Sequence, residues 1–228
     1  MLRLAPLLLA LAYGLVYWHF SAWRTARELD SNSTPLADAG LKTLTDRMAR
    51  ALGLQKISVY VYEIPTINGL AAPDGRIFLT RGFLDRYRAG EVSAEELASV
   101  IAHELGHVAL GHTRRRMIDF SGQNAVRVAL AAVLGRLLPG VGIWIANALV
   151  SMLAAGLSRK DEYEADEYAA ALLTKAGIGT EPQKALLSRL EGLAGMRGAP
   201  PVWLASHPKT VDRVRAIEVL EERWRVAD

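Results

Sequence analysis

Two histidines and a glutamate stand close together in the segment His103-Glu104-Leu105-Gly106-His107. In a helix, residues four positions apart share one face, so the imidazoles of His103 and His107 can reach one metal ion. Imidazole nitrogens suit zinc, and zinc lowers the pKa of a bound water molecule to about 7. Glu104 follows the first histidine by one position, so its carboxylate can accept a proton from that water rather than bind the metal. The pattern predicts hydrolysis by metal-activated water.

This segment lies in an apolar stretch that includes Val100, Ile101 and Val108. Burying two imidazoles and a carboxylate there costs free energy unless the groups are paired or used. A chance match on an amphipathic helix is the alternative. However, the chain has five histidines in 228 residues, and two of them flank this one glutamate. We therefore interpret the segment as the centre of a functional site.

A catalytic zinc site needs a third protein ligand. His112 follows His107 by five positions, which places it about 140° further around an ideal helix. We therefore expect His112 to be a surface or cap residue. Leu110 and Thr113 stand where metzincins carry a glycine and a histidine, so that class of metallopeptidase is excluded.

The acidic run Asp161–Glu167 supplies better candidates for the third ligand. Glu162 and Asp166 are four positions apart, so they share one face of a helix. Glu162 could bind zinc while Asp166 accepts a hydrogen bond from the other ring nitrogen of a ligand histidine. Spacing alone does not separate Glu162 from Glu164. A solvated acidic helix face is the alternative interpretation of the whole run.

Composition narrows the function further. Cysteine is absent, which excludes disulfide bonds and cysteine catalysis. The net charge is +3 and the pI is near 9.3, but no basic stripe is interleaved with aromatic residues, so we expect no nucleic-acid partner. Hydrophobic residues make up 51% of the chain, and their excess lies in residues 4–20 and 126–157. This distribution predicts contact with membrane lipid.

Residues 4–20 are apolar for about seventeen positions, close to the minimum for crossing a bilayer. No clear cleavage site follows, so we expect a single uncleaved N-terminal anchor, in preference to a cleaved signal peptide or a buried helix. Arg3 precedes the run while Arg24 and Arg27 follow it, so the charges leave the orientation open. We place the remaining chain on the extracytoplasmic side, with the cytoplasmic face as the alternative.

The second apolar stretch, residues 126–157, is interrupted by Arg136, Pro139 and several glycines. It is too broken for one clean membrane span. It could form a hairpin of two short helices that enters the membrane, or a hydrophobic lid on the domain. We favour membrane contact.

Hydrophobic periodicity predicts a mainly α fold with a small β-sheet (α+β). Ser93 and Glu96 form a capping box, which opens the helix that carries the two histidines. Ser31–Pro35 is predicted to be a polar linker. The predicted helices cover residues 36–52, 93–115, 158–176, 181–194 and 208–225, and the predicted strands cover 57–64 and 76–80.

The segment 103–107 together with the run from Ser158 to Asp166 resembles the HtpX-like and CAAX-prenyl-protease family of gluzincin metallopeptidases. That family carries a Glu-Tyr-x-Ala-Asp motif after its two-histidine helix. The resemblance implies a zincin-like domain with one zinc ion. It also implies that Glu162 is the third ligand, that Asp166 holds a ligand histidine, and that Glu164 falls on a variable position.

Residues 68–77 resemble the family's Asn-Ala-x-Ala-x-Pro-Gly-Gly-x-Ile segment, with departures at Gly69 and Asp74. The resemblance implies a turn at Arg81–Leu84 after this segment. In the family this segment lies beside the active-site cleft. The resemblance implies that Asn68, Ala71 and Ile77 help to bind substrate, and an exposed strand edge there could hold a peptide backbone. A purely structural hairpin is the alternative.

His207-Pro208 with Arg213 resembles the family's His-Pro-x-x-x-x-Arg motif, which implies a place near the metal. As a hypothesis, His207 stabilises the oxyanion of the tetrahedral intermediate or lies close enough to occlude zinc. A helix cap is the alternative for His207. Arg213 is expected beside the ligands as a supporting residue.

Together these features predict a membrane-associated zinc-dependent endopeptidase. We expect residues 1–30 to form the anchor and the start of a linker, and residues 31–228 to form the peptidase domain with a membrane-facing insert at about 125–157. The resemblance alone implies a role in protein quality control, with misfolded or membrane-associated proteins as substrates. The rival functions are a chaperone-like binding module, against which the intact Glu104 argues, and a zinc hydrolase acting on a non-peptide bond.

Overall fold

The computed structural model describes residues 24, 26–72, 74–112, 127–128, 130–131, 133–195 and 210–227. The predicted anchor at 4–20 and His207 lie outside these residues. The chain divides into two compact units. The larger unit comprises Ser33–Thr113 and Ser158–Asp228, and the smaller unit comprises Met1–Asn32 and Arg114–Leu157.

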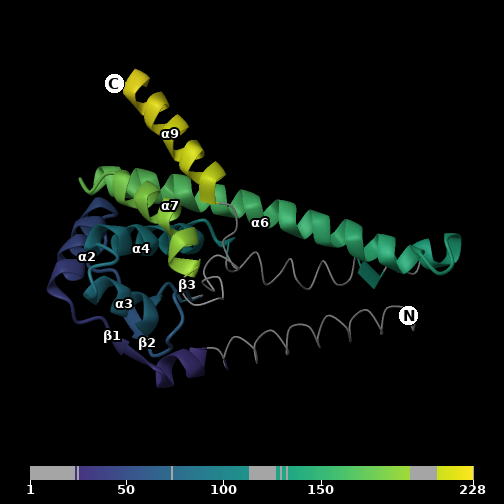
Figure 1. Ribbon diagram of the computed structural model, residues 1–228, viewed down its shortest axis with the longest axis horizontal. Coiled ribbons are helices and arrows are strands. Elements are labelled where there is room, and N and C mark those ends of the chain that lie inside the picture. Colours follow the sequence, from purple (N-terminus) through teal and green to yellow (C-terminus); the bar gives the residue numbers. More distant parts are fainter. Residues whose placement is uncertain are drawn as a thin grey trace, which may run out of the picture. The chain divides into compact units, whose positions relative to one another are not determined.

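The larger unit contains a four-stranded mixed sheet (Figure 1). Its strands are β1 (Ser33–Pro35), β2 (Val59–Tyr62), β3 (Gly69–Ala71) and β4 (Ile77–Thr80), in the spatial order β1-β2-β4-β3. The central pair, β2 and β4, is parallel, and each outer strand is antiparallel to its neighbour. Because β3 ends the order, it is an edge strand in the described part of the chain.

The first strand corrects the predicted linker at Ser31–Pro35. Ser33, Thr34 and Pro35 pair with Tyr62, Val61 and Tyr60. The residue before a proline is driven into extended backbone, and proline itself is tolerated on an edge strand. A polar composition therefore did not prevent this segment from joining the sheet.

Six α-helices have their bounds defined in the described residues: α2 (Ala39–Ala51), α3 (Arg81–Arg88), α4 (Ala94–Ala109), α6 (Gly142–Lys175), α7 (Glu181–Gly195) and α9 (Thr210–Ala227). Helix α3 occupies the place of a predicted turn. The Ser93/Glu96 capping box at the start of α4 is confirmed. Helix α4 ends six residues earlier than predicted, and just beyond it Gly111 adopts φ +69°, a left-handed conformation typical of helix termination.

Helix α4 is the centre of the larger unit. Twelve of its sixteen residues are buried, including the whole segment Glu96–His107. It contacts α2, α7 and the strands β3 and β4. Such a helix is covered on nearly all sides, so the side chains at its C-terminal half are held in fixed positions. The mainly α fold with a small sheet is confirmed.

The smaller unit contains a tight connection between helical segments. Residues 133–137 are helical, residues 138–141 turn, and α6 begins at Gly142. Gly140 adopts φ +87°, and a Cβ on Gly142 would lie 2.1 Å from the carbonyl oxygen of Leu134, so both positions require glycine. Helix α6 then continues for 34 residues, so it begins well before residue 158, where the predicted helix began. Among the described helices, α6 is long and apolar enough to cross a bilayer, a property that core helices of soluble proteins share.

Candidate metal centre and active site

Three side chains from two helices converge in the larger unit. His103 and His107 come from α4, and Glu162 comes from α6. The Nε2 atoms of His103 and His107 lie 3.1 Å apart. The Glu162 carboxylate lies 3.4 Å from Nε2 of His103 and 3.5 Å from Nε2 of His107. All three side chains are buried.

This donor set fits one zinc ion. Tetrahedral zinc with bonds of about 2.0–2.1 Å holds its ligand atoms about 3.3 Å apart, and the three separations here bracket that value. Two imidazoles and one glutamate form a set typical of catalytic zinc, in which the fourth position stays open for water or substrate. The three residues are therefore placed to bind a metal ion, as the sequence predicted.

The two helices approach each other closely where their motifs have small residues. A Cβ on Gly106 would lie 3.0 Å from the Cα and 3.0 Å from the carbonyl oxygen of Ala165. Gly106 stands between the two histidines, and Ala165 stands between Glu162 and Asp166. Since larger residues at this crossing would separate the helices, the small residues bring the histidines within reach of the carboxylates.

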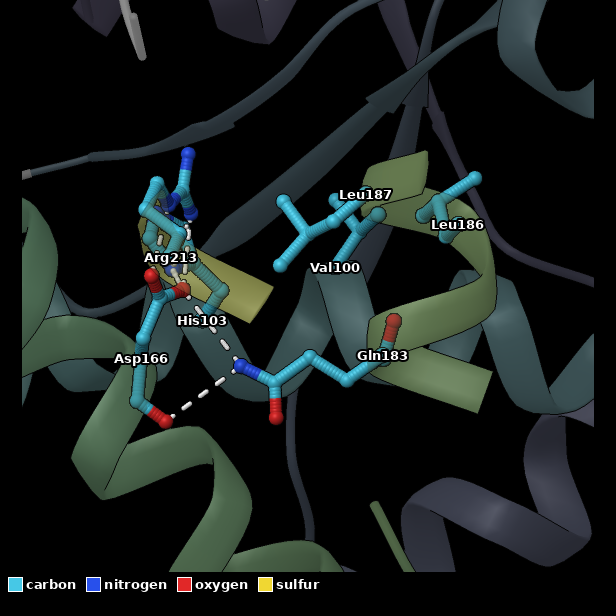
Figure 2. A pocket seen from close by; sticks show the side chains of 8 residues that line it. Val100, His103, Asp166, Gln183, Leu186, Leu187 and Arg213 are labelled. Atoms are coloured by element: carbon cyan, nitrogen blue, oxygen red, sulfur yellow. Dashed lines mark hydrogen bonds and ion pairs between the residues drawn. The ribbon is translucent and has the colours of Figure 1, made fainter. Parts of the chain in front are cut away.

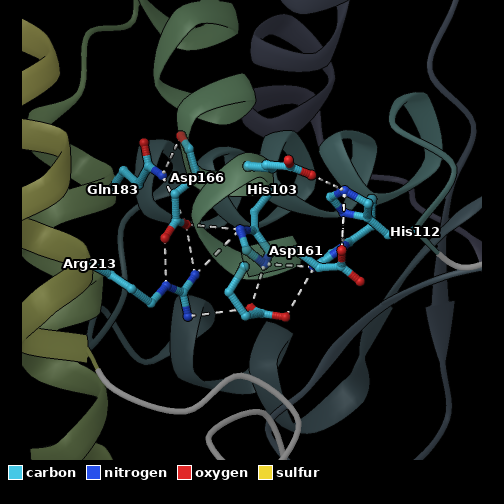
Figure 3. Close-up of polar contacts among 9 residues, drawn as sticks. His103, His112, Asp161, Asp166, Gln183 and Arg213 are labelled. Atoms are coloured by element: carbon cyan, nitrogen blue, oxygen red, sulfur yellow. Dashed lines mark hydrogen bonds and ion pairs between the residues drawn. The ribbon is translucent and has the colours of Figure 1, made fainter. Parts of the chain in front are cut away.

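The second nitrogen of His103 is fixed by a carboxylate, as predicted. Nδ1 of His103 donates a hydrogen bond to Asp166 at 3.0 Å. Arg213 from α9 in turn donates two hydrogen bonds to Asp166, from Nε at 2.6 Å and from Nη2 at 2.7 Å (Figure 3). Asp166 and Arg213 are both buried. Such a forked ion pair compensates two charges that would be costly to bury singly.

These contacts set the charges around the site. Burial alone would raise the pKa of Asp166, but the guanidinium of Arg213 and the hydrogen bond from His103 lower it to about 2. Burial opposes the charged form of His103, yet hydrogen bonds to Asp166 and Glu162 outweigh it and raise the pKa of the imidazole to about 9. The carboxylates therefore favour positive charge at this position, whether a proton or a metal ion carries it.

Gln183 on α7 is a part of the site that the sequence did not reveal. Its amide nitrogen lies 3.3 Å from both the backbone oxygen and Oδ1 of Asp166. Together with His103, Asp166 and Arg213 it lines a small cavity, which Val100, Leu186 and Leu187 complete with apolar side chains (Figure 2). A single glutamine within a predicted helix gives no indication in the sequence that it will contact Asp166.

His112 corrects a prediction. It was expected at the surface or at a cap, but its side chain is fully buried. Its Nδ1 lies 3.0 Å from Nδ1 of His107, and its Nε2 lies 3.0 Å from Glu164 (Figure 3). The prediction assumed an ideal helix through residue 115. Because α4 ends at Ala109 and Gly111 turns the backbone, His112 returns toward His107.

Glu104 and the edge strand β3 lie side by side. Glu104 is buried on α4, and a Cβ on Gly69 would lie 3.5 Å from its Oε1 and 2.7 Å from Cγ1 of Val100. The predicted substrate residues Asn68 and Ala71 are partly buried; Asn68 immediately precedes β3 and Ala71 is its last residue. Ile77 differs, because it is fully buried in β4 and paired with both neighbouring strands.

Comparison with known proteins agrees with this geometry. The model for "Peptidase family M48" matches residues 35–221. Metalloprotease LoiP of Escherichia coli (strain K12) is 30% identical over 201 residues, which cover 85% of this chain and 76% of LoiP. Metalloprotease YcaL of the same organism is 30% identical over 181 residues, covering 75% of this chain and 66% of YcaL.

The mitochondrial metalloendopeptidase OMA1 of Homo sapiens is 28% identical over 178 residues. That match covers 74% of this chain but 33% of the human protein, so the shared part is a third of a longer molecule. The family match spans most of the chain and includes both helices that carry the metal ligands. The chain therefore belongs to peptidase family M48 and is a zinc metalloendopeptidase.

Proposed function

We propose that this metallopeptidase is associated with a membrane and cleaves misfolded or membrane-associated proteins in protein quality control. His103, His107 and Glu162 would hold one zinc ion. When bound, zinc supplies an electrophile that acidifies water and polarises the scissile carbonyl. The convergence of these three buried side chains is the observation that carries the hydrolytic part of the proposal.

Glu104 is the proposed general base. It follows His103 by one position on a rigid, buried helix, so its carboxylate stays beside the ligands without being one of them. It accepts the proton of the attacking water and then passes it to the leaving amine. Asp166 and Arg213 position His103, and their contacts above support that role.

Strand β3 is the proposed docking edge for the substrate backbone. It ends the sheet in the described part of the chain and lies beside Glu104. An extended peptide adding to this edge would pass next to the general base. Ala71 belongs to this edge and Asn68 directly precedes it, whereas Ile77 can only support the sheet from within. Oδ1 of Asn68 is buried and has no hydrogen-bond partner among the described residues, so it could accept a hydrogen bond from a peptide N–H.

His207 is proposed to stabilise the oxyanion, or to occlude the metal in a latent state. This role rests on the His-Pro-x-x-x-x-Arg resemblance. The position of Arg213 supports it, since the other end of that motif reaches the site. Replacing His207 with alanine should change proteolysis strongly while leaving most of the zinc bound: a fall would support the oxyanion role, and a rise would support occlusion of the metal.

Membrane association is proposed from the apolar surface of the smaller unit. Leu137, Trp144 and Met152 expose 71–74% of their surface, and further large apolar side chains around them are also exposed. Exposed apolar surface on this scale is typical of membrane or protein contact. We retain residues 1–30 as the proposed anchor and about 125–157 as the membrane-facing insert of the peptidase domain at 31–228. The extracytoplasmic side is the proposed location of that domain.

The first test compares the wild type with Glu104→Gln on an unfolded protein such as casein, in mild detergent with zinc. Loss of the base should lower the cleavage rate roughly 10²–10⁴-fold. Zinc content, measured by mass spectrometry, should be equal in both. Glu95→Gln, an exposed position on the same helix, is the matched control and should cleave normally. Equal cleavage by wild type and Glu104→Gln would contradict the mechanism.

A further inference from the structure

The two ligand histidines are held in different ways. Nδ1 of His103 meets a carboxylate, whereas Nδ1 of His107 meets the ring of His112 at 3.0 Å. We propose that His112 is a positioning residue, which fixes the tautomer and orientation of His107 for zinc. This inference rests on the proposed zinc ligands, because it concerns what holds one of them in place.

The direction of the hydrogen bonds follows from the ligand geometry. Nε2 of His107 faces the other two ligand atoms, so in the neutral ring the proton must be on Nδ1. That N–H donates to Nδ1 of His112, which must then accept. The proton of His112 is therefore on Nε2, from which it donates to Glu164 at 3.0 Å. Each ring has one donor and one acceptor, and the series ends on a carboxylate, so all the hydrogen bonds are mutually consistent.

The burial of His112 supports a specific role. Its side chain is fully buried, and an imidazole there is retained only where its polar atoms find partners. The left-handed backbone at Gly111 directs the chain back so that these contacts can form. An apolar side chain would need no polar partners in this buried position, so burial alone does not explain a histidine there.

A second metal site is the competing interpretation, because His112, Asp161 and Glu164 also bring three donor atoms together. One observation favours hydrogen bonding. The ammonium of Lys160 lies 3.4 Å from the Glu164 carboxylate and already supplies positive charge there. The two interpretations differ in the number of zinc ions per chain.

Two substitutions of matched shape test the proposal. His112→Asn keeps an amide oxygen near the position of Nδ1, whereas His112→Leu has the same branching and no acceptor. Zinc affinity of the full chain in detergent is measured by competition with a chelator. His112→Leu should weaken zinc binding roughly 10–100-fold, as is typical when such a partner is lost, and His112→Asn should recover most of that loss. Thermal unfolding of the metal-free proteins shows whether each variant is folded.

A second pair keeps the test decisive if His112→Leu does not fold. Glu164→Ala removes the acceptor of His112 and should weaken zinc binding several-fold, while Glu167→Ala, exposed on the same helix, should leave it unchanged. Equal zinc affinity in the Asn and Leu variants would overturn the proposal, as would equal affinity in the two glutamate variants. Two zinc ions per wild-type chain, with one lost in the His112 variants, would also overturn it. Because affinity is measured without proteolysis, these results do not depend on whether Glu104 is the base.

Discussion

Helix α6 is continuous, but its two parts along the chain differ in which side chains are buried and which are exposed. In its part within the larger unit, the carboxylates of Glu162 and Asp166 are buried at 2% exposure. In its part within the smaller unit, Trp144 and Met152 are more than 70% exposed. The polar residues are inside because they are paired and serve a metal site. The apolar residues outside are explained if their surroundings are not water, which is the membrane association proposed above.

The largest expected effect tests the buried charges of the larger unit. Asp166→Asn leaves the guanidinium of Arg213 buried without its carboxylate, which should lower the free energy of unfolding by about 3–5 kcal/mol. It should also weaken zinc binding roughly 10–100-fold. Chemical denaturation and chelator competition measure the two quantities. A loss below about 1 kcal/mol, the range of exposed ion pairs, would contradict the buried pairing.

Acid titration of the metal-free protein tests the same buried ion pair through its dependence on pH. The pKa of Asp166 is lowered to about 2, so this carboxylate contributes stability that is fully present above its unfolded pKa of about 3.9. That contribution is lost as the pH falls from about 4 toward 2. The Asp166→Asn variant should lack this part of the acid transition, which denaturation curves at several pH values would detect.

A smaller effect is expected from a pair of glycines, one at the crossing of α4 and α6 and one on the surface of α6. Gly106→Ala should separate the helices and cost about 1–3 kcal/mol, in addition to weakening zinc binding. A Cβ on Gly156 meets nothing within 4 Å, so Gly156→Ala should be neutral or stabilise by up to about 1 kcal/mol. If both variants have the same free energy of unfolding and the same zinc affinity, the close approach of α4 and α6 does not determine the geometry of the metal site.

The smallest effect on stability is expected from substitutions in the exposed apolar surface of the smaller unit. Their specific effect should be on membrane binding. Serine at Leu137, Trp144 and Met152 together should change the free energy of unfolding by no more than about 0.5 kcal/mol per site. It should nevertheless lower binding to vesicles of anionic lipid, measured by flotation, while zinc affinity stays unchanged. Unaltered flotation would mean that this surface is not the membrane contact.

The metal ligands could be predicted because their information is local. Helical spacing places His103 beside His107 and Glu162 beside Asp166, and the family resemblance selects Glu162 over Glu164. Gln183 was missed because its contact with Asp166 depends on where α7 packs, which no local pattern encodes. His112 was misjudged because the end of α4, and not its periodicity, sets the direction of that side chain.

The fold shows the same division between local and distant information. The capping box and the central strands are local, and they were predicted correctly. The predicted helix start at residue 158 was wrong because a change from apolar to polar side chains alters the surface of a helix and not its backbone. Between Ile143 and Ala176 the sequence has no proline, and its one glycine, Gly156, is tolerated within a helix.

The close approach of Gly106 and Ala165 has a consequence for which sequences can carry this chemistry. Neither residue has a side-chain donor or acceptor, so an inventory of reactive groups would omit both. Yet a Cβ on Gly106 would lie 3.0 Å from the Cα and from the carbonyl oxygen of Ala165, so added atoms at this crossing would separate the helices and increase the distance that the zinc ion must bridge. The residues tolerated at this crossing are therefore limited by volume and not by reactivity. A search for functional relatives should therefore consider small residues here in addition to the histidines.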